Sequence, residues 1–226
     1  MKKTCYTEAA YLLGIIILAI GTAFMEKADF GMSMIVAPAY LLHLKASEYL
    51  PFFSFGMAEY VLQAMILVLL CLVMRRVKRF YFFSFITAVF YGIVLDGSIG
   101  LIAGIPNHTV SLRVLYYVVG MILCTGAVSL LFHTYIAPEA YELFVKELSA
   151  QYRLPINRVK TIYDCASCVL SILLSFLFYG WWQFEGIKWG TVLCALVNGW
   201  MIGRASVLFE QVFTFRDGLP FRKYFE

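Results

Sequence analysis

Long runs of apolar residues, separated by short polar connections, extend over most of the chain. A helix needs roughly 20 apolar residues to cross about 30 Å of bilayer hydrocarbon. The runs are too long for transmembrane strands, and they lack the alternation of apolar and polar residues that such strands show. The pattern therefore predicts six transmembrane helices. Their expected ranges are 7–25, 54–74, 80–102, 114–136, 159–182 and 186–209.

The amino-acid composition indicates the same class of protein. Apolar residues make up 62% of the 226 residues and charged residues only 14%, and the mean hydropathy is +0.81. A soluble domain of this size has to expose part of its surface to water and cannot hide so much apolar surface. We therefore expect an all-α membrane protein that forms a single transmembrane domain, 1–226, in contact with the lipid bilayer.

The two halves of the chain share one pattern. The segment GTAFMEKADFGMSMIVAPAYLL follows the first apolar run, and GAVSLLFHTYIAPEAYELFVKEL follows the fourth. Aligning Gly21 with Gly126 gives each half three spans and a short helix after the first of them. Because three is odd, the second half must insert upside down, which predicts the inverted 3+3 repeat of many secondary transporters. The expected ranges are about 7–105 and about 113–212, followed by a C-terminal tail at 213–226.

The distribution of positive charge predicts the orientation of these spans. With the N-terminus in the cytoplasm, most lysines and arginines fall on the cytoplasmic side, as the positive-inside rule requires. Both termini are then cytoplasmic. The net charge of +4 is spread over short loops, so we expect no nucleic-acid partner. The opposite side receives only Lys27, Lys45, Arg113 and Lys188.

The two short segments differ in character. In 138–151, apolar residues lie on one side, and Glu139, Glu142, Lys146 and Glu147 lie on the other. That pattern predicts a helix lying on the cytoplasmic membrane surface. Its counterpart, 31–44, is almost uncharged. Either a re-entrant piece or an interfacial helix packed on protein fits it, and the pattern does not choose between them.

Three stretches resemble a known family of bacterial membrane proteins. They are the first span with two glycines seven residues apart, the passage APEAYELFVKELS…RVKTIYDCAS, and the closing GIKWGTVLCALVNGWMIG. Over roughly the whole chain they resemble the YczE/YyaS/YitT family, and within it a branch of unknown function. The family's Gly-x-x-Pro-Trp-Asp after the first span is GMSMIV here. The resemblance implies a multi-pass protein of the bacterial inner membrane and a suspected transporter.

Two carboxylates inside predicted spans are the first candidates for a site. Ionisable residues in a bilayer are costly unless they face a cavity or a partner, so each suggests a function. Asp164 lies roughly one to two turns into the fifth span, and the alignment of the halves places Glu59 at the equivalent depth from the other face. Such a pair suits the gates or relays of a proton- or cation-coupled carrier. Alternatively, each bonds a backbone carbonyl or a neighbour such as Lys160 and serves only insertion.

Asp96 and Arg204 occupy near-equivalent positions in the third and sixth spans. The inverted arrangement places them toward opposite faces, so we do not expect them to pair with each other. A contact between Asp96 and Glu59 would require one of them to be protonated. Arg204 shares the cytoplasmic half with Asp164, and a pair between them would be a gate or a structural bridge. An unpaired Arg204 would suit an anionic substrate.

The sixth span, GTVLCALVNG, contains further polar candidates. Small residues allow helices to approach closely, and polar residues bond across a bundle. We expect Thr191 and Asn198 to line a cavity near the midplane, and the glycines to serve helix packing.

No motif in the chain predicts a cofactor, a metal ion or catalysis. Cys165 and Cys168 share a helical face, but a redox pair needs an exposed helix N-terminus. No cysteine lies in an extracytoplasmic loop, where a structural disulfide would form, so we expect all six cysteines to be free thiols. Phosphate-binding, dinucleotide-binding and zinc-protease motifs are absent from the sequence. We therefore expect a protein that is not an enzyme.

Two functions remain open at this point, and a third, an intramembrane enzyme that uses the paired carboxylates for acid–base chemistry, is a weaker alternative. The first is transport of an unidentified small polar or organic solute, with Asp164, Glu59, Asn198, Thr191, Arg204 and Asp96 as binding or coupling residues. The second is an accessory or regulatory role through the charged segment PEAYELFVKELSAQYRLPINR. Six spans are few for a carrier, so a homodimer is considered beside a monomer.

Overall fold

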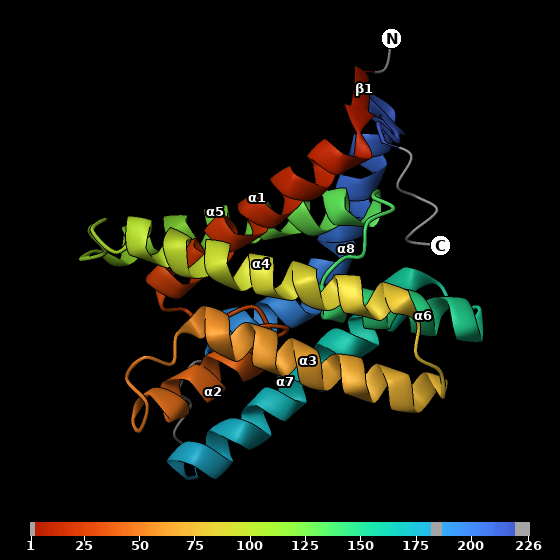
Figure 1. The fold of residues 1–226 in the computed structure, drawn as a ribbon. Coiled ribbons are helices and arrows are strands. Elements are labelled where there is room, and N and C mark those ends of the chain that lie inside the picture. The colour runs from red at the N-terminus through yellow and green to blue at the C-terminus, as the bar shows by residue number, and fades with distance from the viewer. Residues whose placement is uncertain (1–2, 182–186, 220–226) are drawn as a thin grey trace.

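The computed structural model describes residues 3–181 and 187–219, and Figure 1 shows how its helices are arranged. Helices form about three-quarters of this part of the chain. The elements in order are β1 (Lys3–Tyr6), α1 (Thr7–Ala28), α2 (Ala37–Ser47), α3 (Phe55–Met74), α4 (Arg79–Ile102), α5 (Val110–Phe132), α6 (Ala140–Tyr152), α7 (Ile156–Tyr179), α8 (Trp189–Val212) and β2 (Phe213–Arg216).

The all-α class and the six long apolar helices are confirmed. Six helices are long and apolar enough to cross a bilayer, and their outward faces expose residues such as Leu101, Val68 and Leu177. This is the surface that a multi-pass membrane protein presents to lipid. The fourth span begins at Val110 rather than 114, because the Thr109 side chain accepts the Leu112 N–H and caps the helix there. The predicted boundaries 182 and 186 lie outside the described residues.

The order long, short, long, long occurs twice, in α1–α4 and in α5–α8. The first long helices of the two halves, α1 and α5, pack on each other in antiparallel orientation. Their backbones meet at glycines: a Cβ on Gly120 would lie 2.7 Å from the Gly21 carbonyl oxygen, and one on Gly21 would lie 3.0 Å from the Gly120 oxygen. Larger side chains would separate the two helices.

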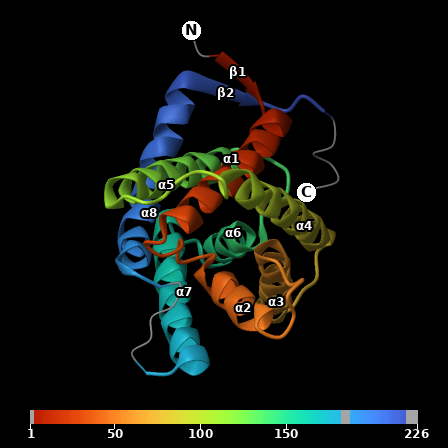
Figure 2. The same ribbon diagram turned by 90° about the vertical axis from the view of Figure 1, so that its left-hand side faces the viewer.

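Each short helix packs against the third helix of both halves. Helix α2 lies against α3 and α7, and α6 lies against α7 and α3, with a smaller contact to α4. Figure 1 shows the two short helices at opposite ends of the bundle, α2 at the left and α6 at the right. Figure 2, which views the bundle from that left-hand end, shows α6 surrounded by longer helices.

The expectation that segment 138–151 lies on the membrane surface is wrong. Tyr141, Glu142, Leu143 and Val145 are buried in the first turns of α6. Glu142 is only 2% exposed, although the pattern places it on the polar, solvent-facing side. The polar face of α6 meets polar residues of other helices instead of water. The surface proposed for an accessory partner therefore lacks one of its key charges. For segment 31–44, the buried start of α2 between α3 and α7 favours a piece enclosed by protein over an exposed one.

The two ends of the described chain lie on the same side of the bundle. Strands β1 and β2 pair in parallel, with Lys3 opposite Phe213 and Tyr6 opposite Arg216 (Figure 2). The Glu8 carboxylate accepts the N–H groups of Gly218 and Leu219. These contacts tie the start of α1 to the segment after α8.

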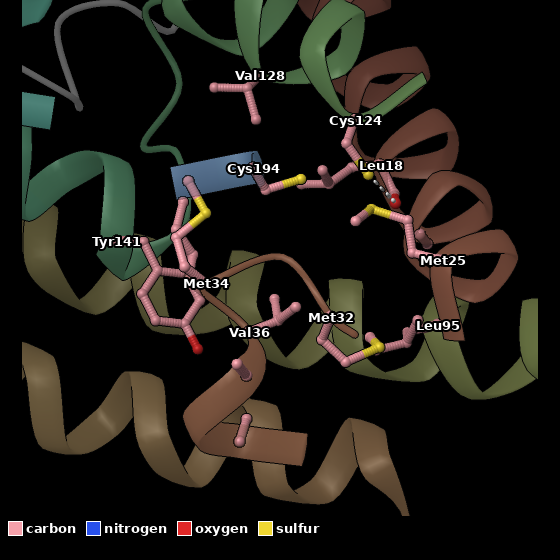
Figure 3. Packing of buried hydrophobic residues seen from close by; sticks show 14 of the residues in the cluster. Leu18, Met25, Met32, Met34, Val36, Leu95, Cys124, Val128, Tyr141 and Cys194 are labelled. Carbon is pink, nitrogen blue, oxygen red and sulfur yellow. Dashed lines mark hydrogen bonds between the residues drawn. The ribbon is translucent and has the colours of Figure 1, made fainter. Parts of the chain in front are cut away.

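The centre of the bundle is rich in sulfur (Figure 3). Met25, Met32 and Met34 are at most 2% exposed and belong to one core with Cys124 and Cys194. The unbranched methionine side chain adapts to irregular spaces. It fills the region where the chain between α1 and α2 crosses the bundle without forming a helix.

Candidate functional site

A group of ionisable and polar side chains is buried between α3, α6 and α7. Every member is at most 2% exposed, and two of the three surrounding helices, α3 and α7, are long and apolar enough to cross a bilayer. We call this group the acidic cluster. It consists of Glu59 and Gln63 on α3, Glu139, Tyr141 and Glu142 at the start of α6, and Lys160 and Asp164 on α7.

Gln63 and Tyr141 join α3 to the first turn of α6. The Tyr141 hydroxyl donates to Glu59 Oε2 at 2.8 Å. The Gln63 side-chain amide donates to Glu139 Oε2 at 3.0 Å and to Glu59 Oε2 at 3.4 Å, while its oxygen accepts the Ala140 N–H at 3.0 Å. All the hydrogen-bonding groups of Gln63 thus face the cluster. The contacts fix the start of α6 against the first half of α3.

Lys160 joins the start of α6 to α7. Its ammonium nitrogen lies 3.2 Å from Asp164 Oδ1, one turn further along α7, and 3.6 Å from Glu142 Oε1. Lys160 is 2% exposed, so its charge has no access to water and depends on these two carboxylates.

Helix α4 holds the segment that leads into α6. The Ser84 hydroxyl donates to the Pro138 carbonyl oxygen at 2.7 Å, and the Thr87 hydroxyl donates to that of Ala137 at 2.9 Å. These bonds satisfy backbone oxygens that would otherwise be buried without partners. They also bring the α6 N-terminus, with its positive end of the helix dipole, to the cluster carboxylates.

The acidic cluster has more carboxyl groups than it has positive charge. It contains four carboxyl groups and one ammonium, and several oxygens have no hydrogen-bond partner: Glu59 Oε1, Glu139 Oε1, Glu142 Oε2 and Asp164 Oδ2. Burial raises the pKa of the Glu139 carboxyl well above its ordinary value, and the nearby carboxylates of Glu142 and Glu59 raise it further. Such a cluster requires protons or another cation to offset its charge.

Comparison with known proteins assigns the chain to a family. A model for DUF6198, a family of unknown function, matches residues 5–206. The chain belongs to DUF6198. No curated protein and no solved structure matches it. The match includes the whole acidic cluster. The family description does not mention YczE/YyaS/YitT, so that resemblance stays a prediction.

In this DUF6198 protein, the two carboxylates singled out from the sequence belong to the same cluster. We expected Asp164 and Glu59 at separate depths. Instead, both flank the first turn of α6: Glu59 bonds to Tyr141, and Asp164 is linked to Glu142 through Lys160. The reason is the inward path of the segment before α6, which the surface-helix prediction missed.

Asp96 and Arg204 lie outside the cluster. The Asp96 carboxylate accepts the Ser54 hydroxyl at 2.6 Å and the Gly56 N–H at 2.8 Å, so it anchors the start of α3. Arg204 is exposed and lies over the Trp200 ring at 5.5 Å. The pair considered between Arg204 and Asp164 does not form. Lys160, one turn before Asp164 on α7, supplies the positive charge beside that carboxylate instead.

Thr191 and Asn198 are buried on α8, where they face other parts of the protein. Asn198 Oδ1 accepts the Thr125 hydroxyl of α5 at 3.4 Å. The Thr191 hydroxyl is buried without a hydrogen-bond partner and lies against Gly31, in the segment before α2. These two side chains lie along the contacts of α8 with α5 and with that segment.

Four cluster residues did not stand out in the sequence: Gln63, Tyr141, Glu139 and Glu142. The amphipathic pattern places the last two in water. A signal is present, since PEAYE puts three polar side chains into the first turn of a helix that directly follows apolar sequence. An amphipathic pattern indicates that a helix has a polar side, and it does not indicate what that side faces.

The cysteines are free, as predicted. Cys124, Cys168 and Cys194 are buried, and Cys165 is exposed, so the two cysteines of KTIYDCASC face different surroundings. Within residues 3–181 and 187–219, no three His, Cys, Asp or Glu side chains are grouped closely enough to hold a metal ion.

Proposed function

We propose that this DUF6198 protein transports a small polar or organic solute across the bacterial inner membrane, and that it is not an enzyme. The observation that carries the proposal is the acidic cluster, four carboxyl groups and one ammonium buried where a short helix begins inside a bundle of spanning helices. In the proposed cycle, the cluster binds and releases protons as the bundle opens to one side and then to the other.

The cost of the acidic cluster supports a functional role. Packed apolar side chains of similar volume would serve stability as well as a buried ion pair does, or better. Intramembrane ionisable groups are typical of substrate and ion pathways and of proton relays. Here Glu59, Glu139 and Asp164 retain oxygens without a partner, which are acceptors for a proton or for a polar group of the solute.

The packing of the helices supports the predicted inverted repeat. Exchanging α1–α4 with α5–α8 reproduces most of the helix contacts: α1 with α4 matches α5 with α8, and α2 with α7 matches α6 with α3. In inverted-repeat carriers, the site lies between the repeats, and half-length helices begin there. We place both termini in the cytoplasm, which puts the far end of α6 on the cytoplasmic side and that of α2 on the other.

The proposed motion follows from the contacts of α6. Its first turn is bound to α3 through Gln63 and Tyr141, and to α7 through Lys160. A proton that binds to a carboxyl group of the cluster weakens the attraction of that group to Lys160, and loss of the proton restores it. A proton or solute therefore changes how firmly α6 is held between α3 and α7, and separation along that interface would open a path from the cluster to one side. Thr191 and Asn198 would contribute polar groups on the α8 side.

A ligand screen followed by an uptake assay tests this function. The detergent-purified protein is heated with amino acids, nucleosides, organic acids, vitamins and cations, and each solute that raises the melting temperature is tested for uptake into proteoliposomes with and without a pH gradient. A ligand stabilises the folded state by mass action. We expect at least one solute to bind and to be taken up, with uptake driven by the pH gradient.

Matched variants assign the result to the acidic cluster. Glu59→Gln and Asp164→Asn remove one ionisable group each with little change in volume, and we expect both to abolish gradient-driven uptake. Asp96→Asn is the control, since Asp96 is also a carboxylate within a long helix but anchors the start of α3. It should keep the ligand-induced shift relative to its own melting temperature. Equal uptake by wild type, Glu59→Gln and Asp164→Asn would contradict the proposal, as would the absence of any binding solute.

A further inference from the structure

A groove of about 620 Å³ runs along the outside of the bundle between α7 and α8, away from the acidic cluster. Its lining combines two small residues, one large aromatic residue and two positive charges. It is lined by Arg158, Thr161 and Ile162 on α7, and by Gly199, Trp200, Gly203 and Arg204 on α8.

Glycines form the floor of this groove. Gly199 and Gly203 lie one turn apart on α8, so one strip of that helix has no side chains. At Gly199 the helices are close, since a Cβ there would lie 3.0 Å from the Thr161 hydroxyl oxygen. Ile162 and Trp200 border the groove and are 66% and 64% exposed. The floor of the groove is therefore apolar, and the groove opens toward the lipid side of two spanning helices.

Two arginines make this groove different from an ordinary lipid-facing surface. Arg158 and Arg204 are both exposed in the groove, and the Arg204 guanidinium lies 5.5 Å from the centre of the Trp200 ring. Over the part of the chain that the structure describes, neither arginine pairs with a carboxylate. The nearby acids are engaged elsewhere: Asp164 with Lys160, and Glu210 with His133. A guanidinium beside hydrocarbon favours an anionic partner.

We propose that this groove binds an anionic phospholipid. The headgroup phosphate is held by Arg158 and Arg204, and one acyl chain lies along the strip at Gly199 and Gly203. The position of the arginines fits this occupant. Arg158 is the third residue of α7, and Arg204 lies on the half of α8 that leads to the paired termini, so both are near the same side of the bundle. Basic pockets between spanning helices are typical sites for anionic headgroups.

A second copy of the chain suits the groove less well. Small residues four apart are also typical of helix–helix interfaces in membranes. A twofold interface through this face would, however, place the same patch of both copies together. The arginines of one copy would then meet those of the other, with no carboxylate in the groove to separate them. Charge complementarity therefore favours a phosphate.

Native mass spectrometry of the delipidated full-length protein tests the proposal. The protein is titrated with phosphatidylglycerol and, separately, with phosphatidylcholine of the same chains. We expect wild type to retain phosphatidylglycerol about tenfold more strongly, because both lipids carry a phosphate but the choline ammonium of phosphatidylcholine cancels its charge. The double variant Arg158→Gln/Arg204→Gln should lose this preference. Arg216→Gln removes a positive charge from β2, outside the groove, and should keep it.

Further variants and a competition with inorganic phosphate distinguish the possible causes of the lipid preference. The double variant Arg158→Lys/Arg204→Lys keeps both positive charges and should keep most of the preference for phosphatidylglycerol. A loss of this preference in the glutamine variant alone is then due to the missing charges. Gly203→Leu fills the strip and should weaken binding of both lipids. Inorganic phosphate should not displace the lipid at concentrations that match it, because it lacks the acyl chain.

Three results would overturn the proposal: equal retention of the two lipids by wild type, an unchanged preference in the glutamine variant, and a dimer that Gly203→Leu dissociates without any effect of lipid. The last result would assign the groove to a second copy. None of these measurements depends on whether the protein transports a solute.

Discussion

The two short helices, α2 and α6, follow the first long helix of their own half and pack against the same two helices, α3 and α7, yet they bring opposite chemistry into the bundle. The segment leading into α2 buries Met32, Met34, Ile35 and Val36. The start of α6 buries Glu139 and Glu142 along with Tyr141. The α2 side is apolar and rich in sulfur, and the α6 side is acidic.

The segments that lead into these two helices are also held in different ways. The segment before α2 is fixed at its exposed beginning, where the Asp29 carboxylate meets Arg113 at 2.9 Å and Lys188 at 2.5 Å. The segment before α6 is fixed inside the bundle, by the hydroxyls of Ser84 and Thr87 on α4.

The α2 side of the bundle is therefore held by apolar packing, whereas the α6 side contains the buried ionisable groups. Apolar packing on the α2 side needs no opposite charges to balance it, and the buried side chains there are mostly not ionisable. The α6 side is stable only while its carboxyl groups are protonated or paired, so its stability depends on protons, on Lys160 and on bound ligands. The two sides, although their backbone paths are similar, therefore respond differently to substitution and to pH.

The largest effect is expected from removing the ammonium of the acidic cluster. Lys160→Met leaves Glu142 and Asp164 without their positive partner, and breaking a buried pair from one side typically costs about 3–5 kcal/mol. Thermal unfolding in detergent should show a large fall in melting temperature. The double variant Lys160→Met/Asp164→Asn removes one charge of each sign and should recover much of the loss. Lys45→Met, which breaks the exposed pair with Glu48, is the control and should change the melting temperature little. Equal effects of Lys160→Met and Lys45→Met would refute the charge balance described here.

On the α2 side, the most sensitive position is expected to be a glycine. Gly31 has a φ of +100°, and a Cβ there would lie 2.5 Å from the Thr191 hydroxyl oxygen and 2.7 Å from the backbone nitrogen of Lys188. Gly31→Ala should therefore destabilise the protein by about 1–3 kcal/mol. Gly97→Ala provides the comparison, because nothing lies within 4 Å of a Cβ at Gly97 on α4. It should be neutral or stabilising by up to about 1 kcal/mol. If both substitutions lower the melting temperature equally, the tight contact with α8 is not what constrains the segment.

A smaller effect, and one confined to the α6 side, is expected from pH. Because the pKa of Glu139 is raised in the folded protein, the folded state binds more protons than the unfolded state above the ordinary value of 4.5. Its contribution to stability is therefore complete below that value and is lost as pH rises through the raised pKa. The melting temperature measured from about pH 5 to about pH 9 should fall less steeply in Glu139→Gln than in wild type. Glu48→Gln, at an exposed position, is the matched control variant. A slope that is identical in wild type and Glu139→Gln would exclude this assignment.

The smallest effect is expected at the exposed anchor of the α2 side. Asp29→Asn removes the charge that meets Arg113 and Lys188, while asparagine still tolerates the positive φ of 54° at this position. Asp29 is 60% exposed, so the loss should be about 1 kcal/mol or less and should disappear at high salt. Melting temperatures at low and high ionic strength would check this. A large, salt-independent loss would show that the anchor is more important than its exposure indicates.

The long helices could be predicted from the sequence because the residues of each reflect its own surroundings. Twenty apolar residues in succession indicate that a helix faces lipid, whatever its neighbours are. The helix ends were less certain. The start of α5 moved to Val110 because the local cap at Thr109 sets it, and α7 begins at Ile156, directly after Pro155.

The acidic cluster could be predicted only in part, because it depends on contacts between distant segments. Glu59 and Asp164 stood out as charges within apolar runs. Glu139 and Glu142 did not, because an acidic helix face looks the same whether it meets water or Gln63 and Lys160 of other helices. The inward path of 133–139 is set by hydroxyls on α4, and no local pattern in that segment reveals them.

The central claim is that the acidic cluster holds protons at neutral pH inside the bundle. Infrared spectroscopy of the protein in lipid nanodiscs measures this directly, since protonated and ionised carboxyl groups absorb at different frequencies. We predict protonated carboxyl bands at neutral pH that disappear in part in Glu59→Gln and in Glu139→Gln, and that persist in Asp96→Asn. Spectra with only ionised carboxylates at neutral pH, or bands that none of the cluster variants changes, would contradict this claim.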